Sequence, residues 1–375
     1  MNADIRPDRL AAAELAPIDR VGCAAYKVPT SSPESDGTFE WQATTLVLVE
    51  VSAAGRTGVG FSYADTATAT LVRDTLAALI VGRDAFDIGA CWSAMVAGIR
   101  NLGRPGIASM AISAVDTALW DLKGRLLDLP VTTLLGRTRA SVPVYGSGGF
   151  TSCGIDDLQR QLAGWVQSGI TGVKMKVGRE PSADAARVRA ARKAIGAETQ
   201  LMVDGNAAYS RKQALDMAQR FAEHGVCWFE EPVSSDDLAG LHLLRDRAPA
   251  GMDISAGEYG YDAGYFLRML QAQAVDVLQA DATRCAGITG FLSAAALAEA
   301  FMLPLSSHCA PSLHVAACCA APSVKHLEYF YDHARIEHLL FDGALDPVEG
   351  GLRADTTRPG LGLEFRKRDA QRYLV

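Results

Sequence analysis

The spacing of hydrophobic and polar residues changes near residue 140 of the 375-residue chain. Before this point, two apolar stretches rich in β-branched residues predict strands over residues 20–28 and 43–53. The segment between them, residues 28–41, is polar and rich in turn-forming residues, so it predicts a loop, and a second loop is expected from Gly58. Apolar residues at helical spacing follow over residues 112–126. This part of the chain therefore predicts a mixed α+β domain.

From about residue 140, short apolar runs alternate regularly with amphipathic stretches. The apolar runs predict eight strands, at residues 142–147, 172–177, 200–204, 227–230, 252–256, 275–279, 302–306 and 325–330. Helical patterns lie between them, for example over residues 155–168 and 182–195. Eight strands with seven intervening helices predict a parallel (β/α)7β barrel, a modified (β/α)8-type α/β fold. An open doubly wound sheet is the alternative, but the sequence GSGGF at Gly146 lacks the acidic residue that a dinucleotide-binding turn needs.

These patterns divide the chain into three expected parts. Residues 1–138 are expected to form a capping domain and residues 139–335 the catalytic barrel. Residues 336–375 are rich in glycine and proline and are expected to return to the capping domain and complete it. A hydrophobic content of 49% with 21% charged residues is typical of a globular protein with a large core.

Charge and cysteine content exclude several classes of protein. The net charge is −7 and no basic run occurs, so nucleic acid and anionic membranes are not expected partners. No uncharged apolar stretch reaches the roughly 20 residues that a membrane span needs, and the N-terminal residues lack the apolar core of a signal peptide. The eight cysteines form no C-x-x-C pair and are expected to be free thiols. A cytoplasmic protein is the expected result.

Acidic residues end three successive predicted barrel strands. Asp204 ends the third strand, Glu230 ends the fourth, and Glu258 follows the fifth. The carboxyl ends of barrel strands meet at one mouth, so these side chains are expected to converge. Hard oxygen ligands of this kind suit Mg²⁺. Glu231 rivals Glu230 as a ligand, and three unrelated surface acids are the alternative explanation.

Basic residues occupy other strand ends. Lys174 and Lys176 are two positions apart in the second strand, so both are expected to point into the barrel. Asp281 ends the sixth strand and His308 ends the seventh, which predicts a dyad in which the carboxylate orients the imidazole. Glu328, in the eighth strand, is expected to face the same mouth. A solvent-facing edge strand is the alternative for the lysines, and a structural role is the alternative for the histidine.

The order of these motifs resembles the enolase superfamily, and specifically its mandelate racemase group. The resemblance rests on VKMKV, MVDGN, WFEEP, SAGEYG, LQADAT and SSHCAP, in that order. It covers nearly the whole chain and implies a capping domain, a barrel and a C-terminal return. It also implies homo-oligomers, either dimers or octamers.

The resemblance implies roles for the residues at the matching positions. Asp204, Glu230 and Glu258 would bind one Mg²⁺ per subunit. Lys176 would be one acid/base catalyst, and Lys174 would support both Lys176 and the substrate carboxylate. The proximity of the two lysines is expected to lower the pKa of Lys176.

The resemblance also implies a second catalyst and further substrate contacts. His308, oriented by Asp281, would be the acid/base catalyst on the opposite face of the substrate. Glu328 would hydrogen-bond the developing enolate. Candidate contacts to substrate hydroxyl groups are Asn206, Tyr145 and Ser147.

The reaction expected from this set is dehydration of an acid sugar to a 2-keto-3-deoxy acid. Related cycloisomerases and dipeptide epimerases carry a lysine where this chain has Asp281, so those activities are disfavoured. Racemisation or epimerisation through the same intermediate is the alternative, and an inactive metal-binding relative is a third possibility. Residues 28–41 contain three acids but no lysine or arginine, which favours a mono-acid sugar over a diacid unless Lys27 or Arg56 reaches the site.

Overall fold

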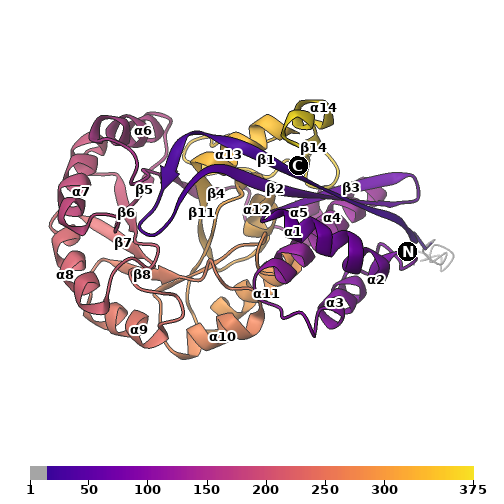
Figure 1. Ribbon diagram of the computed structural model, residues 1–375, viewed down its shortest axis with the longest axis horizontal. Helices are drawn as coiled ribbons and strands as arrows, with labels where there is room; N and C mark the ends of the chain where they lie inside the picture. Colours follow the sequence, from indigo (N-terminus) through magenta and orange to yellow (C-terminus); the bar gives the residue numbers. More distant parts are fainter. Residues whose placement is uncertain (1–14) are drawn as a thin grey trace, which may run out of the picture.

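The computed structural model describes residues 15–375 (Figure 1). Residues 1–14 lie outside the described residues. They include the start of the predicted capping domain and most of the N-terminal segment in which no signal peptide was predicted. Within residues 15–375, no helix combines the length and the apolar character needed to cross a membrane.

The N-terminal part forms an antiparallel three-stranded sheet covered by helices. Its strands are β1 (Ile18–Ser35), β2 (Glu40–Ala53) and β3 (Arg56–Tyr63). Its helices are α1 (Thr66–Leu71), a π-helical turn (Val72–Leu76), α2 (Ala77–Ile80), α3 (Ile88–Gly98), α4 (Ile107–Leu127) and α5 (Val131–Leu135). The α+β domain predicted from the sequence is therefore confirmed.

The loop predicted from Gly58 is wrong, because this segment is strand β3. A side chain at Gly58 would place its Cβ 2.3 Å from the carbonyl oxygen of Ala118, and one at Gly60 would lie 2.3 Å from the carbonyl oxygen of Ala114. Both carbonyls belong to α4. The glycines therefore allow a helix to approach the strand closely and do not mark a turn.

Most of the loop predicted over residues 28–41 is also strand. β1 continues to Ser35 and pairs there with Glu40, so β1 and β2 form a long two-stranded ribbon that extends over the barrel (Figure 1). The ribbon turns at Asp36, whose Oδ1 accepts hydrogen bonds from the backbone N–H groups of Thr38 and Phe39. The segment was predicted as a loop because its residues are polar, but a ribbon that extends beyond the core does not need an apolar face.

The second half of the chain is a closed parallel barrel, as predicted. The strands are β4 (Val142–Gly148), β5 (Gly172–Lys176), β6 (Gln200–Asp204), β7 (Val226–Glu230), β8 (Asp253–Ala256), β9 (Val277–Ala280), β10 (Leu305–Ser307) and β11 (Val324–Phe330). Neighbours in this order are hydrogen-bonded, and β11 pairs with β4 to close the ring. The intervening helices are α6 (Ile155–Gln167), α7 (Pro181–Ile195), α8 (Arg211–Ala222), α9 (Leu238–Arg247), α10 (Ala263–Gln271), α11 (Gly287–Ala300) and α12 (Pro311–Ala320).

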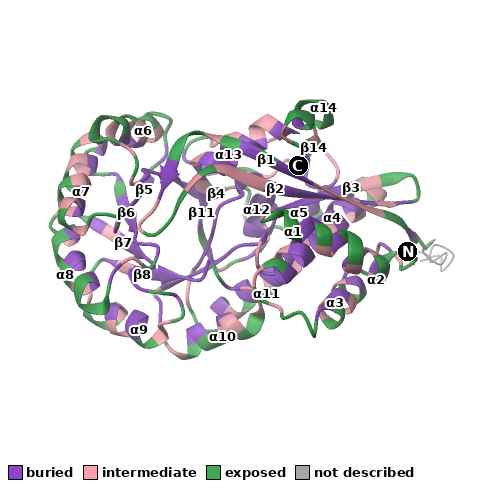
Figure 2. Ribbon diagram, viewed as in Figure 1, coloured by how far each residue is buried: buried purple, intermediate pink, exposed green. Residues whose placement is uncertain are grey.

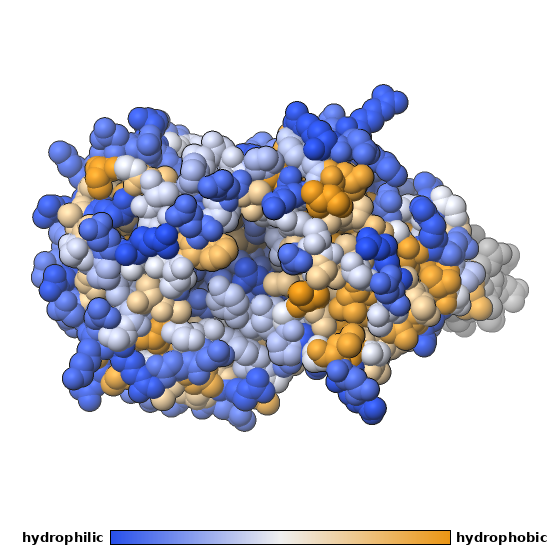
Figure 3. All heavy atoms as spheres, in the orientation of Figure 1, coloured by the Kyte–Doolittle hydropathy of each residue, from blue (hydrophilic) through white to orange (hydrophobic). Residues whose placement is uncertain are grey.

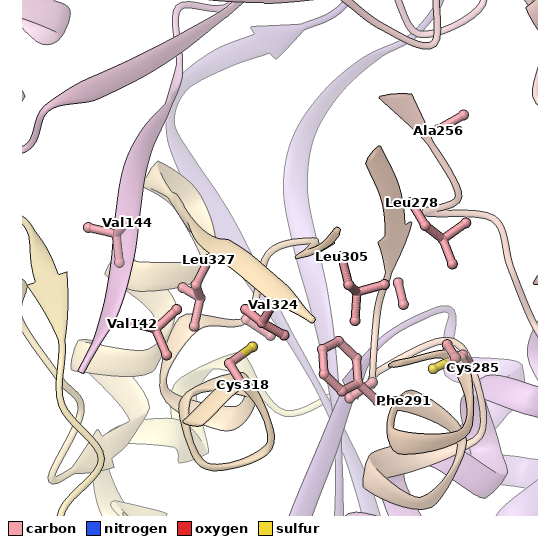
Figure 4. Close-up of a cluster of buried hydrophobic side chains, with 14 of the residues drawn as sticks. Val142, Val144, Ala256, Leu278, Cys285, Phe291, Leu305, Cys318, Val324 and Leu327 are labelled. Carbon is pink, nitrogen blue, oxygen red and sulfur yellow. The ribbon is translucent and has the colours of Figure 1, made fainter. Parts of the chain in front are cut away.

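The main core lies between the barrel strands and the surrounding helices. Figure 4 shows part of it, where Val142 of β4, Leu305 of β10 and Leu327 of β11 face Cys318 of α12 and Phe291 of α11. The strands are buried while the outer helix faces are exposed (Figure 2). Burial of both strand faces explains the continuous apolar runs in the sequence.

The C-terminal segment contacts both domains. It consists of α13 (Tyr331–Leu340), β12 (Phe341–Asp342), β13 (Gly351–Leu352), β14 (Glu364–Phe365), α14 (Lys367–Ala370) and a 3₁₀ turn (Gln371–Tyr373). β13 pairs with β4 of the barrel, whereas the N–H group of Val375 donates a hydrogen bond to the carbonyl oxygen of Ala25 in β1. Glu364 forms an ion pair of 2.6 Å with Arg125 of α4.

Candidate active site

The strand register places the predicted residues level with one another at the barrel mouth. Lys176 at the end of β5 is the register partner of Asp204 at the end of β6, and Asp204 is the partner of Glu230 at the end of β7. Since the strands are parallel and end together, these three side chains emerge side by side. Asp204 and Glu230 are fully buried.

Three carboxylates form a compact cluster at this mouth. One oxygen of each of Asp204, Glu230 and Glu258 lies within 4.8 Å of the others. Burial raises the pKa of Glu230 to about 7 against the lowering effect of Lys174. Oε2 of Glu258 is buried and accepts no hydrogen bond. Three oxygen donors, one of them unpartnered, fit a hard divalent cation such as Mg²⁺.

Two buried lysines neutralise part of this negative charge. Nζ of Lys174 lies 2.7 Å from Glu230 and 2.8 Å from Glu328, and Nζ of Lys176 lies 2.5 Å from Asp204. Burial lowers the pKa of Lys176, but the carboxylate of Asp204 outweighs burial and also the effect of Lys174, so the pKa is raised. The expected lowering of the pKa is therefore wrong for this structure, because the Asp204 carboxylate, 2.5 Å from Nζ of Lys176, has a larger effect than Lys174.

His308 and Asp281 form a hydrogen-bonded pair. Nδ1 of His308 lies 2.8 Å from Oδ2 of Asp281, while Oδ1 of Asp281 accepts hydrogen bonds from the N–H and hydroxyl groups of Thr283. An ionised carboxylate can only accept, so the proton is on Nδ1 and Nε2 faces the pocket. Burial lowers the pKa of His308, but Glu258 and Asp281 outweigh it and the pKa is raised.

Glu328 and Asn206 complete the set near the mouth. Oε2 of Glu328 accepts a hydrogen bond from the N–H group of Cys309. Burial raises the pKa of Glu328, but Lys174 and then His308 lower it well below its usual range. The ionised form accepts hydrogen bonds, whereas the expected bond to an enolate would need a protonated carboxyl. Asn206 has a φ of +43°, and its buried Oδ1 has no hydrogen-bond partner.

A cavity of about 470 Å³ opens above these residues. Figure 3 shows it as a hollow between the barrel on the left and the N-terminal domain on the right. Its barrel side includes Lys176, Asn206, Glu258, His308 and Glu328. We call the side formed by the N-terminal domain the roof; its polar residues are Asp36, Thr38, Thr44, Thr45, Asp65, Trp41 and Tyr63, and it also includes Phe39.

The ribbon that carries most of the roof fits tightly against the barrel. A Cβ at Gly37 would lie 2.6 Å from the carbonyl oxygen of Gly205 and 2.7 Å from that of Val177. The hydroxyl group of Thr38 donates a hydrogen bond to the carbonyl oxygen of Asn206. The tip of the ribbon therefore rests on the segments that follow β5 and β6.

Some predicted residues lie away from the cavity. Tyr145 and Ser147 are buried and are not among its lining residues. The ring of Tyr145 packs inside the barrel with Trp228, beneath Lys174, whose Nζ is 5.3 Å from the ring centre. Both contacts remain predictions: the two residues lie on β4, where Ser147 is the register partner of Lys174, two residues before the end of β5. Glu231, the alternative ligand to Glu230, is also buried, but the cluster of three carboxylates is formed with Glu230.

Sequence reasoning did not identify several residues of the cavity wall. Arg284 contacts Oε1 of Glu258 at 3.2 Å and lies over the ring of Tyr259. Cys309 follows His308 directly and lines the cavity, which its place in SSHCAP could have indicated. No sequence motif marks Thr44, Thr45 or Asp65 as cavity residues, because only the fold brings the N-terminal domain over the barrel.

Comparison with known families places this geometry in a known group. Residues 24–136 match the mandelate racemase/muconate lactonizing enzyme N-terminal domain, and residues 157–370 match the enolase C-terminal domain-like family. The chain belongs to the mandelate racemase group of the enolase superfamily. The resemblance inferred from the six motifs is thus confirmed.

Two characterised relatives of this enolase-superfamily chain act on sugar acids. A 3,6-anhydro-α-L-galactonate cycloisomerase of Streptomyces coelicolor is 33% identical over 93% of this chain and 98% of that protein. An L-talarate/galactarate dehydratase of Salmonella typhimurium is 32% identical over 89% of this chain and 85% of that protein. The comparisons therefore support an enzyme that carries out an enolase-type reaction on a small acid.

Solved structures agree with the fold throughout the chain. A mandelate racemase/muconate lactonizing enzyme-like protein from Rubrobacter xylanophilus is 53% identical, with a TM-score of 0.94 over 96% of this chain and 100% of that chain. A racemase from Streptomyces coelicolor with bound magnesium is 32% identical, with a TM-score of 0.90 over 96% of this chain and 100% of that chain.

Proposed function

We propose that this protein is a Mg²⁺-dependent acid sugar dehydratase. The observation that carries the proposal is that Lys176 and Nε2 of His308 reach one cavity from separate parts of the barrel, with the carboxylate cluster beside them. β5 and β10 are separated by β4 and β11 on one side of the ring and by β6 to β9 on the other. Two proton-transfer groups on different sides of a substrate suit loss of a proton from one face and departure of a group from the other.

The charges at the mouth favour binding of an acid. Mg²⁺ held by Asp204, Glu230 and Glu258 would place positive charge beside the substrate carboxylate, where negative charge grows as the α-proton leaves. Lys174, which is fully buried between Glu230 and Glu328, adds a fixed positive charge beneath the cavity. The buried position excludes water, so each of these charges acts more strongly than it would at the surface.

The reaction then needs one base and one acid. Either Lys176 or His308 takes the proton from the carbon next to the carboxylate, and both line the cavity. The hydroxyl group on the adjacent carbon takes a proton from the acid on the other side and leaves as water. The enol that remains gains a proton at its third carbon and becomes the 2-keto-3-deoxy acid. Asp281 holds the ring of His308 in the orientation that this transfer needs.

The roof supports a mono-acid sugar as substrate. Among the described residues that line the cavity, those from the N-terminal domain include hydroxyl groups and the carboxylates of Asp36 and Asp65 but no lysine or arginine. Such groups hydrogen-bond sugar hydroxyls and repel a second carboxylate. Lys27 and Arg56, which could have reversed this interpretation, are exposed and do not line the cavity.

A sugar-acid cycloisomerase is the second candidate. Asp281 disfavours the cycloisomerases that carry a lysine at this position, but the 33% identity to a sugar-acid cycloisomerase favours this activity. The same proton abstraction would expel a ring oxygen from the β-carbon, so the product would keep all the atoms of the substrate. Racemisation or epimerisation remains the alternative in which no group leaves and the intermediate is reprotonated on the opposite face.

The test is a screen of purified protein with Mg²⁺ against mono-acid, diacid and anhydro sugar acids. The dehydratase predicts a 2-keto-3-deoxy product lighter than its substrate by one water, and mono-acids turned over faster than diacids. A product of unchanged mass with an opened ring would favour the cycloisomerase, and α-deuterium exchange without either product would favour a racemase.

Two matched variants connect any activity to the site. His308→Asn should abolish turnover, whereas His242→Asn, a change of the same kind at a half-buried position of α9 away from the cavity, should not. Equal activity in both variants would contradict the assignment of His308.

A further inference from the structure

A second group of potential metal ligands lies beside the carboxylate cluster. Nε2 of His308 is 3.2 Å from Sγ of Cys309, which is 3.4 Å from Oε2 of Glu328. The third side of this triangle, from Nε2 of His308 to Oε2 of Glu328, is 3.9 Å. All three residues are buried, and all three line the cavity.

The donor atoms of this triangle differ from those of the carboxylate cluster. Nitrogen, sulfur and oxygen donors suit Zn²⁺ and other thiophilic ions, whereas three carboxylates suit Mg²⁺. Tetrahedral Zn²⁺ with ordinary bond lengths of about 2.0–2.3 Å separates its ligand atoms by roughly 3.3–3.6 Å. The three observed separations bracket this range, so small side-chain rotations would bring the atoms to coordinating positions.

The surroundings of the triangle hold its donors in place. Asp281 accepts the Nδ1–H of His308, so Nε2, 3.2 Å from the sulfur, is the ring nitrogen that can coordinate an ion once it is unprotonated. A carboxylate on the far nitrogen is the usual support of a zinc-bound histidine. The N–H group of Cys309 donates to the same oxygen of Glu328 that faces the sulfur. Oε2 of Glu258, buried and without a hydrogen bond, lies 3.2 Å from Nε2 of His308.

We propose that His308, Cys309 and Glu328 form an inhibitory site for a thiophilic divalent ion of the Zn²⁺ type, separate from the Mg²⁺ site. Binding releases the proton of the Cys309 thiol, and the Nε2 proton of His308 where the ring is protonated, to solvent and leaves the fourth coordination position open to the cavity. The inhibitory part rests on the proposed function, because an ion on Nε2 of His308 blocks the nitrogen that would transfer a proton. The binding part stands on the geometry alone.

The binding experiment titrates the full-length protein with Cd²⁺ in saturating Mg²⁺ and records the thiolate-to-cadmium charge-transfer band in the ultraviolet. One equivalent of Cd²⁺ should produce the band in the wild-type protein. Cys309→Ser should abolish it, whereas Cys227→Ser, the same change near the start of β7, should retain it. A band of equal size in Cys309→Ser, or no band in the wild type, would overturn the proposal.

Two further variants keep the cysteine and change its neighbours. Asp281→Asn should weaken the Cd²⁺ affinity by about 10- to 100-fold, as loss of a supporting carboxylate does in other metal sites. His308→Asn should weaken it at least as much, and unchanged affinity in both variants would contradict the assigned ligand set. These readouts need no turnover, so they separate failure of this site from failure of the proposed function. If an acid sugar is turned over, added Zn²⁺ should inhibit the wild type and not Cys309→Ser, provided that this variant is active.

Discussion

The two sides of the cavity differ in how their residues are held. The barrel side consists of buried charges that contact one another, such as Lys174 with Glu230 and His308 with Asp281. The roof consists of hydroxyl groups, acids and aromatic rings, most of them on the β1–β2 ribbon, and Phe39 at the tip of the ribbon is 64% exposed. One side is suited to chemistry that needs fixed charges, and the other is suited to selection among substrates.

The difference has an electrostatic reason. A buried charge is costly unless an opposite charge or a hydrogen-bond donor compensates it, so removal of one partner leaves the other uncompensated. The barrel side should therefore tolerate little change. The roof is more exposed, and water can replace a lost contact there, so its changes should be smaller and should depend on the substrate.

The largest effect is expected for Asp204→Asn on the barrel side. This change removes one carboxylate of the cluster and the ion-pair partner of Lys176. Mg²⁺ affinity measured by calorimetry should fall sharply, and turnover should fall by about 10³-fold or more, because several kcal/mol of charge stabilisation are lost. Asp253→Asn, at the start of β8 and half exposed, is the control. A variant of Asp204 with wild-type Mg²⁺ affinity would refute the ligand assignment.

The next largest effect is expected for Asp281→Asn. The carboxylate no longer fixes the proton on Nδ1 of His308, so kcat should fall by about 10²- to 10⁴-fold while Mg²⁺ affinity stays near the wild-type value. Turnover and Mg²⁺ titrations on the same preparation separate the two quantities. Loss of Mg²⁺ binding together with activity would mean that Asp281 maintains the whole mouth rather than one histidine.

A smaller effect is expected where the roof meets the barrel. In Gly37→Ala, the new methyl group would meet the carbonyl oxygens of Val177 and Gly205 and push the tip away. Such overpacking typically costs about 1–3 kcal/mol, so KM should rise by roughly 10-fold with a smaller change in kcat. Hydrogen exchange of residues 28–41 should speed up in this variant. An unchanged KM would show that the tip plays no part in holding the substrate.

The smallest effect on activity is expected for a buried carboxylate that lies on neither side of the cavity. Glu337 of α13 accepts a hydrogen bond from the N–H group of Ser312, and burial raises its pKa to about 8. The folded state therefore binds this proton more tightly than the unfolded chain, where the pKa is about 4.3. The stability that this proton contributes is full below about pH 4 and is lost as the pH rises toward 8.

Glu337→Gln should remove this pH dependence. Between pH 5 and pH 8, the free energy of unfolding of the variant should rise relative to that of the wild type by about 3–4 kcal/mol, measured with denaturant in saturating Mg²⁺. A constant difference across this range would show that the Glu337 carboxylate is already compensated in the folded protein.

Sequence patterns located the barrel well and the N-terminal domain less well. Strands such as 200–204 and 325–330 were predicted within a residue of β6 and β11, because burial on both faces leaves an uninterrupted apolar run. The region around Gly58 was misread, since a glycine that admits a helix looks the same in sequence as a glycine in a turn. The ribbon was missed because its strands end in polar residues.

The sequence by itself determined which residues stand at the barrel mouth, because each of them ends an apolar strand and parallel strands end at the same rim. Only the tertiary structure decided which of these residues touch. It showed that Asp204 raises the pKa of Lys176 and that Cys309 lies against His308. It also placed Tyr145 below the cavity and Thr44, Thr45 and Asp65 above it. The physical reason is that strand periodicity encodes the direction of a side chain, whereas distances between side chains depend on packing among segments far apart in the chain.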